Sequence, residues 1–201
     1  MNFKTYYTVV GLVIFLFSFP KNLNAQDYNT FGFRVGLNSA NIFSIIPDET
    51  NVRRDIAISG FYKMHITEEL IFFQPELGFS RKGSKMRLDD VDYNLNLNYL
   101  DLPLLLSIGK KNISFVEIGG YLSYLVHSNL SNANTLDVNT DDLIRLDYGL
   151  AVGLNANYEN YSIGLRYYYG LRNIAEGTME NLLGEKSRNS TFQIYATYTF
   201  F

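Results

Sequence analysis

The segment Leu146–Tyr158 (LDYGLAVGLNANY) alternates between two kinds of side chain at almost every step. One parity is apolar: Leu146, Tyr148, Leu150, Val152, Leu154 and Ala156. A period of two predicts a β-strand with one apolar face. The other parity carries Gly, Ala, Asn and a single Asp, which suits a crowded interior with little water better than open solvent. A transmembrane β-barrel has this arrangement, with apolar side chains toward lipid and polar ones inside. The segment therefore predicts a membrane-spanning strand.

The first residues of the chain have the pattern of a secretory signal peptide. Lys4 makes a short positive start, residues 8–19 form an uncharged and mostly apolar run, and Ala25 offers a small residue before a cut. An N-terminal membrane anchor is the alternative, but the run is short for a spanning helix. We therefore expect residues 1–25 to be a cleaved signal peptide and residues 26–201 to be one domain. The exact cleavage site is not predicted, because Leu23, at the third residue before the cut, is larger than usual.

Composition excludes several classes of protein. The chain has no cysteine, so it has neither disulfides nor a lipoprotein anchor. Its net charge of -3 argues against a nucleic-acid partner. After residue 25 no apolar run approaches the roughly 18 residues of a spanning helix, and no helical period is sustained. If the mature protein enters a membrane, it does so as strands.

Further segments repeat the alternation. They cover residues 31–38, 56–65, 71–80, 100–108, 116–126, 161–171 and 192–200. Upstream of Tyr99 the apolar parity switches to Leu95 and Leu97, which predicts a β-bulge there. With the first segment the strands number about eight, and an even number suits a closed antiparallel barrel. The predicted fold is all-β: a transmembrane, antiparallel, up-and-down barrel of eight strands.

The predicted connections alternate in length. Long polar segments are expected at residues 47–53, 82–92, 129–142 and 173–189, and short turns at 67–69, 110–112 and 159–160. Outer-membrane barrels have long loops outside and short turns in the periplasm. A soluble lipocalin-like barrel also has eight strands, but it does not need this alternation. Both chain ends are then expected at the periplasmic side.

Aromatic residues are expected to form two girdles at the membrane borders. Tyr161, Tyr198, Phe200 and Phe201 belong to the turn end, and Tyr62, Phe79, Tyr148, Tyr167 and Tyr169 are expected at or nearer the loop end. Phe201 is similar to the aromatic C-terminal signal that the outer-membrane assembly machinery reads. It stands one residue beyond Phe200, where the apolar parity ends.

Five stretches resemble the PorT-like family of bacterial outer-membrane β-barrel proteins, often called porin-family proteins. They are GFRVGLN at 32–38, QPELGFSRKG at 74–83, LNYLDLPL at 97–104, EIGGY at 117–121 and YSIGLRYYYGL at 161–171. They span nearly the whole mature chain, and each alone is weakly specific. The resemblance implies a fold and an outer-membrane location. It implies no shared catalytic reaction, although one group in the family assists a secretion system.

The inward parity carries charged residues: Arg34, Lys63, Glu76, Asp101, Glu117, Asp147 and Arg166. An eight-stranded barrel has an interior just wide enough for side chains to fill. In that space the charges are expected to pair, because an isolated buried charge costs several kcal/mol. The favoured interpretation is a structural network that plugs the barrel. A narrow, gated ion path through the same residues is the alternative.

Signals for catalysis and for metal binding are weak. Ser123, Ser128 and His127 near the outer rim invite comparison with lipid deacylases, but Ser123 and His127 are expected to point inward, and His65 lies far away. Two acidic clusters, at residues 89–94 and 137–142, lack the glycine and distal glutamate of an EF-hand loop. No cofactor, metal or catalytic residue is therefore assigned.

The predicted role is that of a structural or interaction barrel in the outer membrane, which displays surface loops or docks partners. An association with secretion is implied only by the resemblance to the PorT-like family. A narrow porin-like channel is the alternative, and a lipid-modifying enzyme is a lesser one. The expected partners are outer-membrane lipid, the assembly machinery and a periplasmic or surface protein. The barrel itself is expected to be monomeric.

Overall fold

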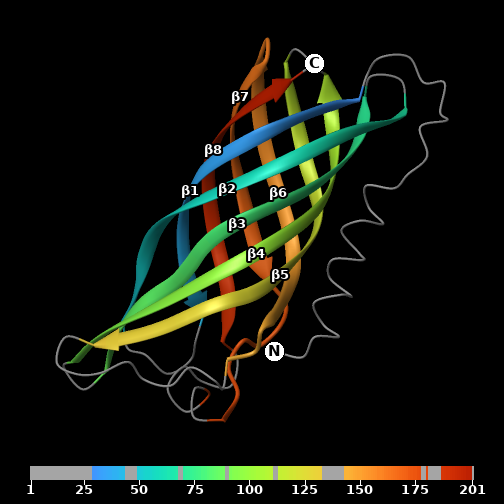
Figure 1. The fold of residues 1–201 in the computed structure, drawn as a ribbon. Helices are drawn as coiled ribbons and strands as arrows, with labels where there is room; N and C mark the ends of the chain where they lie inside the picture. Colours follow the sequence, from blue (N-terminus) through green and yellow to red (C-terminus); the bar gives the residue numbers. More distant parts are fainter. Residues whose placement is uncertain are drawn as a thin grey trace.

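The computed structural model describes residues 29–43, 49–67, 70–88, 91–110, 113–132, 143–177, 180 and 187–200. The predicted signal peptide, the cluster at 137–142 and Phe201 lie outside these residues. The strands are β1 (Thr30–Phe43), β2 (Glu49–Thr67), β3 (Ile71–Leu88), β4 (Val91–Lys110), β5 (Ser114–Asn132), β6 (Leu146–Tyr158), β7 (Tyr161–Gly170) and β8 (Arg188–Phe200) (Figure 1).

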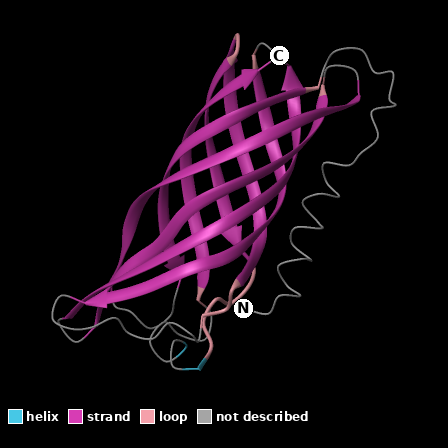
Figure 2. Cartoon of the chain, in the orientation of Figure 1, coloured by secondary structure: helices cyan, strands magenta, loops and turns pink. Residues whose placement is uncertain are grey.

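Within the described residues these eight strands form a single closed barrel in chain order. Each strand pairs antiparallel with its neighbours, and β1 closes the ring against β8 from Phe31↔Phe200 to Phe43↔Arg188 (Figure 2). The predicted all-β, up-and-down barrel of eight strands is confirmed. No helix in the described part of the chain is long and apolar enough to cross a membrane.

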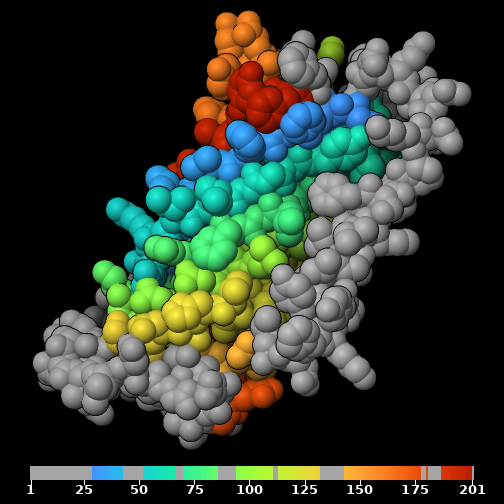
Figure 3. Space-filling model, in the orientation of Figure 1, coloured from blue at the N-terminus to red at the C-terminus, as the bar shows by residue number. Residues whose placement is uncertain are grey.

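The predicted alternation of faces is confirmed most clearly in β6, where exposed and buried residues alternate from Leu146 to Ala156. Leu150 is 56% exposed and Ala151 is 2% exposed. Exposed aliphatic side chains continue around the wall, including Val35, Leu37, Ile56, Ile58, Ile118, Leu154, Ile163 and Ile194. Soluble proteins rarely expose an apolar surface of this extent. In Figure 3 the side chains of β1 to β5 pack side by side along this wall.

Four strands extend well beyond the apolar band, the belt of exposed apolar side chains around the outer wall. β2, β3, β4 and β5 have 19, 18, 20 and 19 residues, whereas β7 has 10. In Figure 1 they run on together beyond the rest of the barrel at its lower left. The predicted long loop at residues 82–92 is wrong, because the ladder of β3 and β4 continues to Leu88↔Val91. The expected alternation of long and short connections therefore fails at this hairpin.

The predicted bulge is also displaced. Leu95, Leu97 and Tyr99 are buried on the same parity of β4, so the alternation of that strand is uninterrupted. The irregularity lies in β5: Tyr99 faces Leu125 and Asn98 faces His127, which leaves Val126 as the extra residue. An extra residue reverses the faces that follow it. His127 is therefore exposed, and the expectation that it points inward is wrong.

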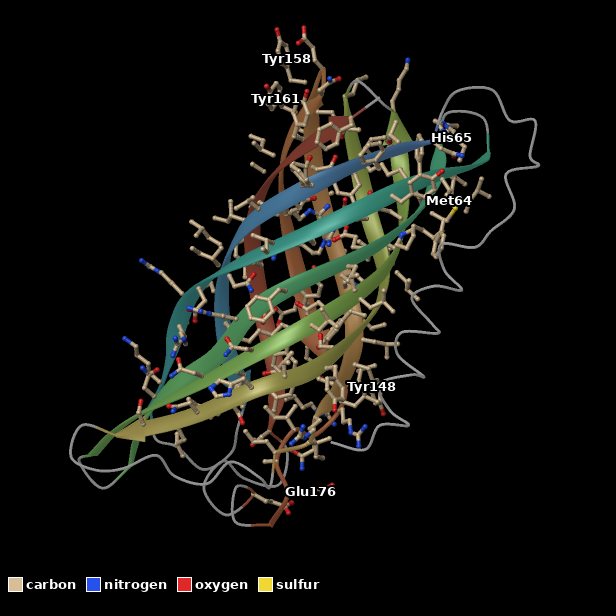
Figure 4. All side chains as sticks on the ribbon, viewed as in Figure 1. Met64, His65, Tyr148, Tyr158, Tyr161 and Glu176 are labelled. Carbon is tan, nitrogen blue, oxygen red and sulfur yellow. The ribbon has the colours of Figure 1, made fainter. Side chains whose placement is uncertain are left out.

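Aromatic rings gather at the turn end of the outer wall. The Phe200 ring lies 5.0 Å from those of Phe31 and Tyr198, and the Tyr161 ring lies 5.1 Å from that of Tyr198. Tyr62 pairs with Phe31, so it belongs to this end and not to the loop end as expected. Tyr158 and Tyr161 lie at one end of the barrel and Tyr148 toward the other (Figure 4).

Candidate functional site

A closed ring of ion pairs crosses the barrel interior. Its members come from alternate strands: Arg34 (β1), Glu76 (β3), Glu117 (β5) and Arg166 (β7). Arg34 lies 2.9 Å from Glu76 and 3.3 Å from Glu117. Arg166 lies 2.9 Å from Glu76 and is also paired with Glu117. Each arginine contacts both glutamates, and no side chain in the ring is more than 4% exposed. Two positive and two negative charges therefore compensate one another across the barrel.

Neutral side chains complete the hydrogen bonding of this ring. The Asn155 amide and the Tyr195 hydroxyl donate to Glu117 over 3.0 and 3.1 Å. Gln74 donates to Glu76 and accepts from Ser107. The Arg34 guanidinium lies 3.9 Å above the centre of the Tyr195 ring. Buried ion pairs are stable only when their remaining donors and acceptors are satisfied, and these contacts do most of that.

A second polar layer lies toward the loop end, and Lys82 is its cation. The ammonium of Lys82 lies 3.1 Å from Asp101 and donates to the Ser123 hydroxyl over the same distance. It also lies 4.7 Å from the centre of the Tyr99 ring. Sequence reasoning missed Lys82 because it was assigned to a loop. The available signal was the inward parity of Ser80 and Ser84 on either side of it, both of which are buried.

Two predicted lumen residues have neutral partners. Asp147 accepts hydrogen bonds from the Asn189 amide over 2.8 Å and from the Tyr121 hydroxyl over 3.3 Å. The Lys63 ammonium lies 4.5 Å from the centre of the Phe115 ring, and no carboxylate among the described side chains pairs with it. The structure thus brings five of the seven predicted residues into ion pairs and leaves these two in other contacts. With Lys82 included, this set of inward-facing side chains has four basic and four acidic members.

Apolar groups close the interior beyond these layers. Toward the loop end lies a buried cluster of Ile42, Leu95, Leu97, Tyr99, Leu125, Leu130, Leu143, Ile174 and Ala175. Toward the turn end the Phe72 ring packs edge-on against Phe115 at 5.1 Å and against His65 at 4.2 Å. A cavity of about 20 Å³ beside Arg34 and Glu76 has room for about one water molecule. The described interior is therefore filled with side chains along its length.

The residues considered for catalysis are not brought together. Ser123 is 1% exposed and is bonded to Asp101 and Lys82 inside the barrel. His127 is exposed on the outer wall, and His65 packs against Phe72 at the turn end. In the described part of the chain no group of three or more His, Asp or Glu side chains could hold a metal ion.

Glycine at position 164 leaves the space that the Tyr195 ring occupies. A Cβ atom there would meet the Tyr195 hydroxyl at 2.5 Å and the Leu154 carbonyl oxygen at 2.7 Å. We predict that Gly164→Ala lowers the free energy of unfolding by about 1–3 kcal/mol, because overpacking displaces Tyr195 from Glu117. Urea titration of the barrel in lipid vesicles measures the change. Gly60→Ala is the matched control, because the nearest atom to its Cβ would be 3.9 Å away, and equal losses in both variants would contradict the prediction.

A closed antiparallel barrel with an apolar outer wall and a charged, filled interior defines the class of outer-membrane β-barrel proteins. Residues 24–176 match the family described as outer membrane protein beta-barrel domain, and the chain belongs to that family. Its location is the bacterial outer membrane.

Solved structures with similar folds include Ail, the attachment invasion locus protein of Yersinia pestis, in complex with the heparin analogue sucrose octasulfate. That comparison has 14% identity and a TM-score of 0.49, and covers 87% of this chain and 100% of that one. Neisserial surface protein A has 12% identity, the same coverage and a TM-score of 0.49. The outer membrane enzyme PagL has 8% identity and a TM-score of 0.45, over 85% and 99% of the two chains. Comparison with curated protein sequences finds no match.

Proposed function

We propose that this protein acts through its outer surface, as a barrel that displays a binding platform, and not as a pore or an enzyme. The observation that carries the proposal is the ring of Arg34, Glu76, Glu117 and Arg166, which spans the interior with side chains 0–4% exposed. A solute would have to break buried, charge-assisted hydrogen bonds to pass. The apolar cluster above the ring and the aromatic rings below it add two further barriers.

The extension of β2 to β5 supplies the platform. Its ladders remain paired to Glu49↔Arg87, Leu88↔Val91 and Tyr93↔Asn132, so it is a continuous four-stranded sheet beyond the apolar band. A paired sheet loses less conformational entropy on binding than a flexible loop. We therefore place the contact with a protein partner on this extension at the cell surface.

The finer assignments from the sequence belong to the same proposal. Residues 1–25 are removed on export, Phe201 is read by the assembly machinery, and the barrel is monomeric. The resemblance to the PorT-like family supports a secretion-associated partner on the periplasmic or the outer side. N-terminal sequencing of the protein from purified outer membranes tests the processing step, because a chain that still begins at Met1 would contradict it.

The closed interior is tested by electrical recording. We predict that the purified, folded barrel in planar bilayers gives no steady, reproducible conductance step, while a known porin from the same preparation gives one. Regular steps from this protein would overturn the proposal in favour of the narrow channel.

The platform is tested separately by shortening the hairpin of β3 and β4. Deleting residues 86–93 joins the facing pair Lys85↔Asn94 and preserves the register below it. We expect this variant to fold and to stay non-conducting, but to lose the protein that cross-links to the wild-type barrel in intact cells. Retention of the same cross-linked protein by the shortened barrel would exclude this extension as the contact.

A further inference from the structure

Basic side chains border the apolar wall at its loop end. Arg54 on β2, Arg81 and Lys85 on β3 and His127 on β5 are all exposed. Arg54 stands two residues from Ile56, Arg81 two residues from Phe79, and His127 beside Val126, which are exposed apolar residues of the same strands. In Figure 4 nitrogen-tipped side chains point away from the barrel near its lower end. We call Arg54, Arg81, Lys85 and His127 the basic border.

The strand register relates Arg81 and His127 across one intervening strand. Arg81 faces Asn98 on β4, and Asn98 faces His127 on β5. Directly opposed side chains of neighbouring strands have Cβ atoms about 4.5–5.5 Å apart. Arg54 faces Ser39 on the neighbouring β1. The basic border therefore lies on the loop-end side of the wall on β2, β3 and β5, with Lys85 four residues beyond Arg81.

The arginines of the basic border differ from the neighbouring cations Arg53 and Lys82. Among the described side chains no carboxylate pairs with Arg54 or Arg81, whereas Arg53 is paired with Asp55 and Lys82 with Asp101. The chain as a whole is slightly acidic, with a net charge of -3, so the border is a local feature. The opposite border is aromatic instead, with Tyr158 75% and Tyr161 61% exposed.

We infer that the basic border binds the phosphate groups of phosphorylated lipids in the outer leaflet. The apolar wall fixes the depth of the hydrocarbon, so groups one step beyond it lie at the level of the lipid head groups. An arginine guanidinium matches a phosphate with two parallel hydrogen bonds, and basic residues at a membrane surface attract anionic lipids. This inference concerns the outer wall and is independent of whether the interior conducts.

The test uses the processed full-length barrel in dodecylmaltoside micelles. Bisphosphorylated lipid A, the same lipid stripped of phosphate, and inorganic phosphate are titrated in turn, with bound lipid counted by native mass spectrometry. We expect the phosphorylated lipid to bind at least tenfold more tightly than the stripped one. Each arginine contributes about 1 kcal/mol, or about fivefold, so Arg54→Gln with Arg81→Gln should weaken binding about 25-fold.

Two further variants separate charge from folding. Arg81→Lys keeps the charge but not the two parallel hydrogen bonds, so it should weaken binding less than Arg81→Gln does, and Lys110→Gln removes an exposed charge at the turn end and should change nothing. Folding of each variant is verified by heat-dependent gel migration. Equal binding of both lipids, full affinity in the double variant, or complete competition by inorganic phosphate would each overturn the inference.

Discussion

Glu117→Ala should lower the free energy of unfolding of the barrel by about 3–5 kcal/mol, because it leaves two buried arginines with Glu76 as their one shared carboxylate in the ring, and so one buried positive charge uncompensated. Glu117 accepts from Arg34 and Arg166, and also from Asn155 and Tyr195. Its side chain is 0% exposed, so water cannot replace it. Urea unfolding in lipid vesicles, followed by tyrosine fluorescence and heat-dependent gel migration, measures the loss.

A double variant separates the charge from the cavity. Glu117→Ala combined with Arg166→Met removes one partner of each sign and leaves Arg34 paired with Glu76 at 2.9 Å. Because replacing a whole buried ion pair with apolar groups is often neutral, the double variant should be more stable than Glu117→Ala alone. Asp55→Ala is a control outside the ring, and it should cost less because its pair with Arg53 is partly exposed. A loss below about 1 kcal/mol for Glu117→Ala would exclude the ring.

The spanning part of this fold follows from the side-chain period. In β6 the apolar parity read from the sequence is the exposed parity of the structure, residue by residue from Leu146 to Ala156. The signal is strong because both environments are extreme: hydrocarbon accepts only apolar side chains, and the narrow interior accepts glycine, alanine and hydrogen-bonded polar groups. Closure in chain order then follows from antiparallel pairing of consecutive strands.

The same rule fails above the apolar band. There the strands face water on the outside and an apolar cluster on the inside, so Leu95, Leu97 and Tyr99 point inward on the parity that is polar below. If the apolar parity is assumed to face lipid along the whole strand, this reversal is mistaken for a β-bulge in β4. The true bulge, at Val126 in β5, has no comparable signal in the sequence. Polar alternation in the extended sheet likewise resembles a loop, which concealed Lys82.

Which charges pair could not be predicted either. Parity gives the face on which a residue lies. Its position along the barrel axis relative to residues of other strands depends on the shift in register from strand to strand around the barrel. Arg166 meets Glu76 across 90 residues of sequence, whereas Asp147 on a neighbouring strand of the same interior meets only neutral donors. Residue types and faces were accessible from the sequence, and the contacts required the register.

Arginine at position 152 should lower the free energy of unfolding in lipid vesicles by about 2–4 kcal/mol, as charged residues do on the lipid face near the bilayer midplane. Val152 is 49% exposed and stands at the centre of β6, between Leu150 and Leu154 on the same face. Tyr158→Arg is the matched control at the border of the wall, where the cost should fall to about 0–1 kcal/mol. Both losses are measured by urea titration in phosphatidylcholine vesicles.

The gradient between these two positions tests which solvent covers the wall. In water a surface arginine changes stability by less than about 0.5 kcal/mol wherever it stands, so the two variants would then behave alike. In hydrocarbon the penalty depends on depth, and only Val152→Arg should be strongly destabilised. Equal, small effects would mean that the exposed aliphatic side chains face water, and the assignment of the wall to lipid would then be wrong.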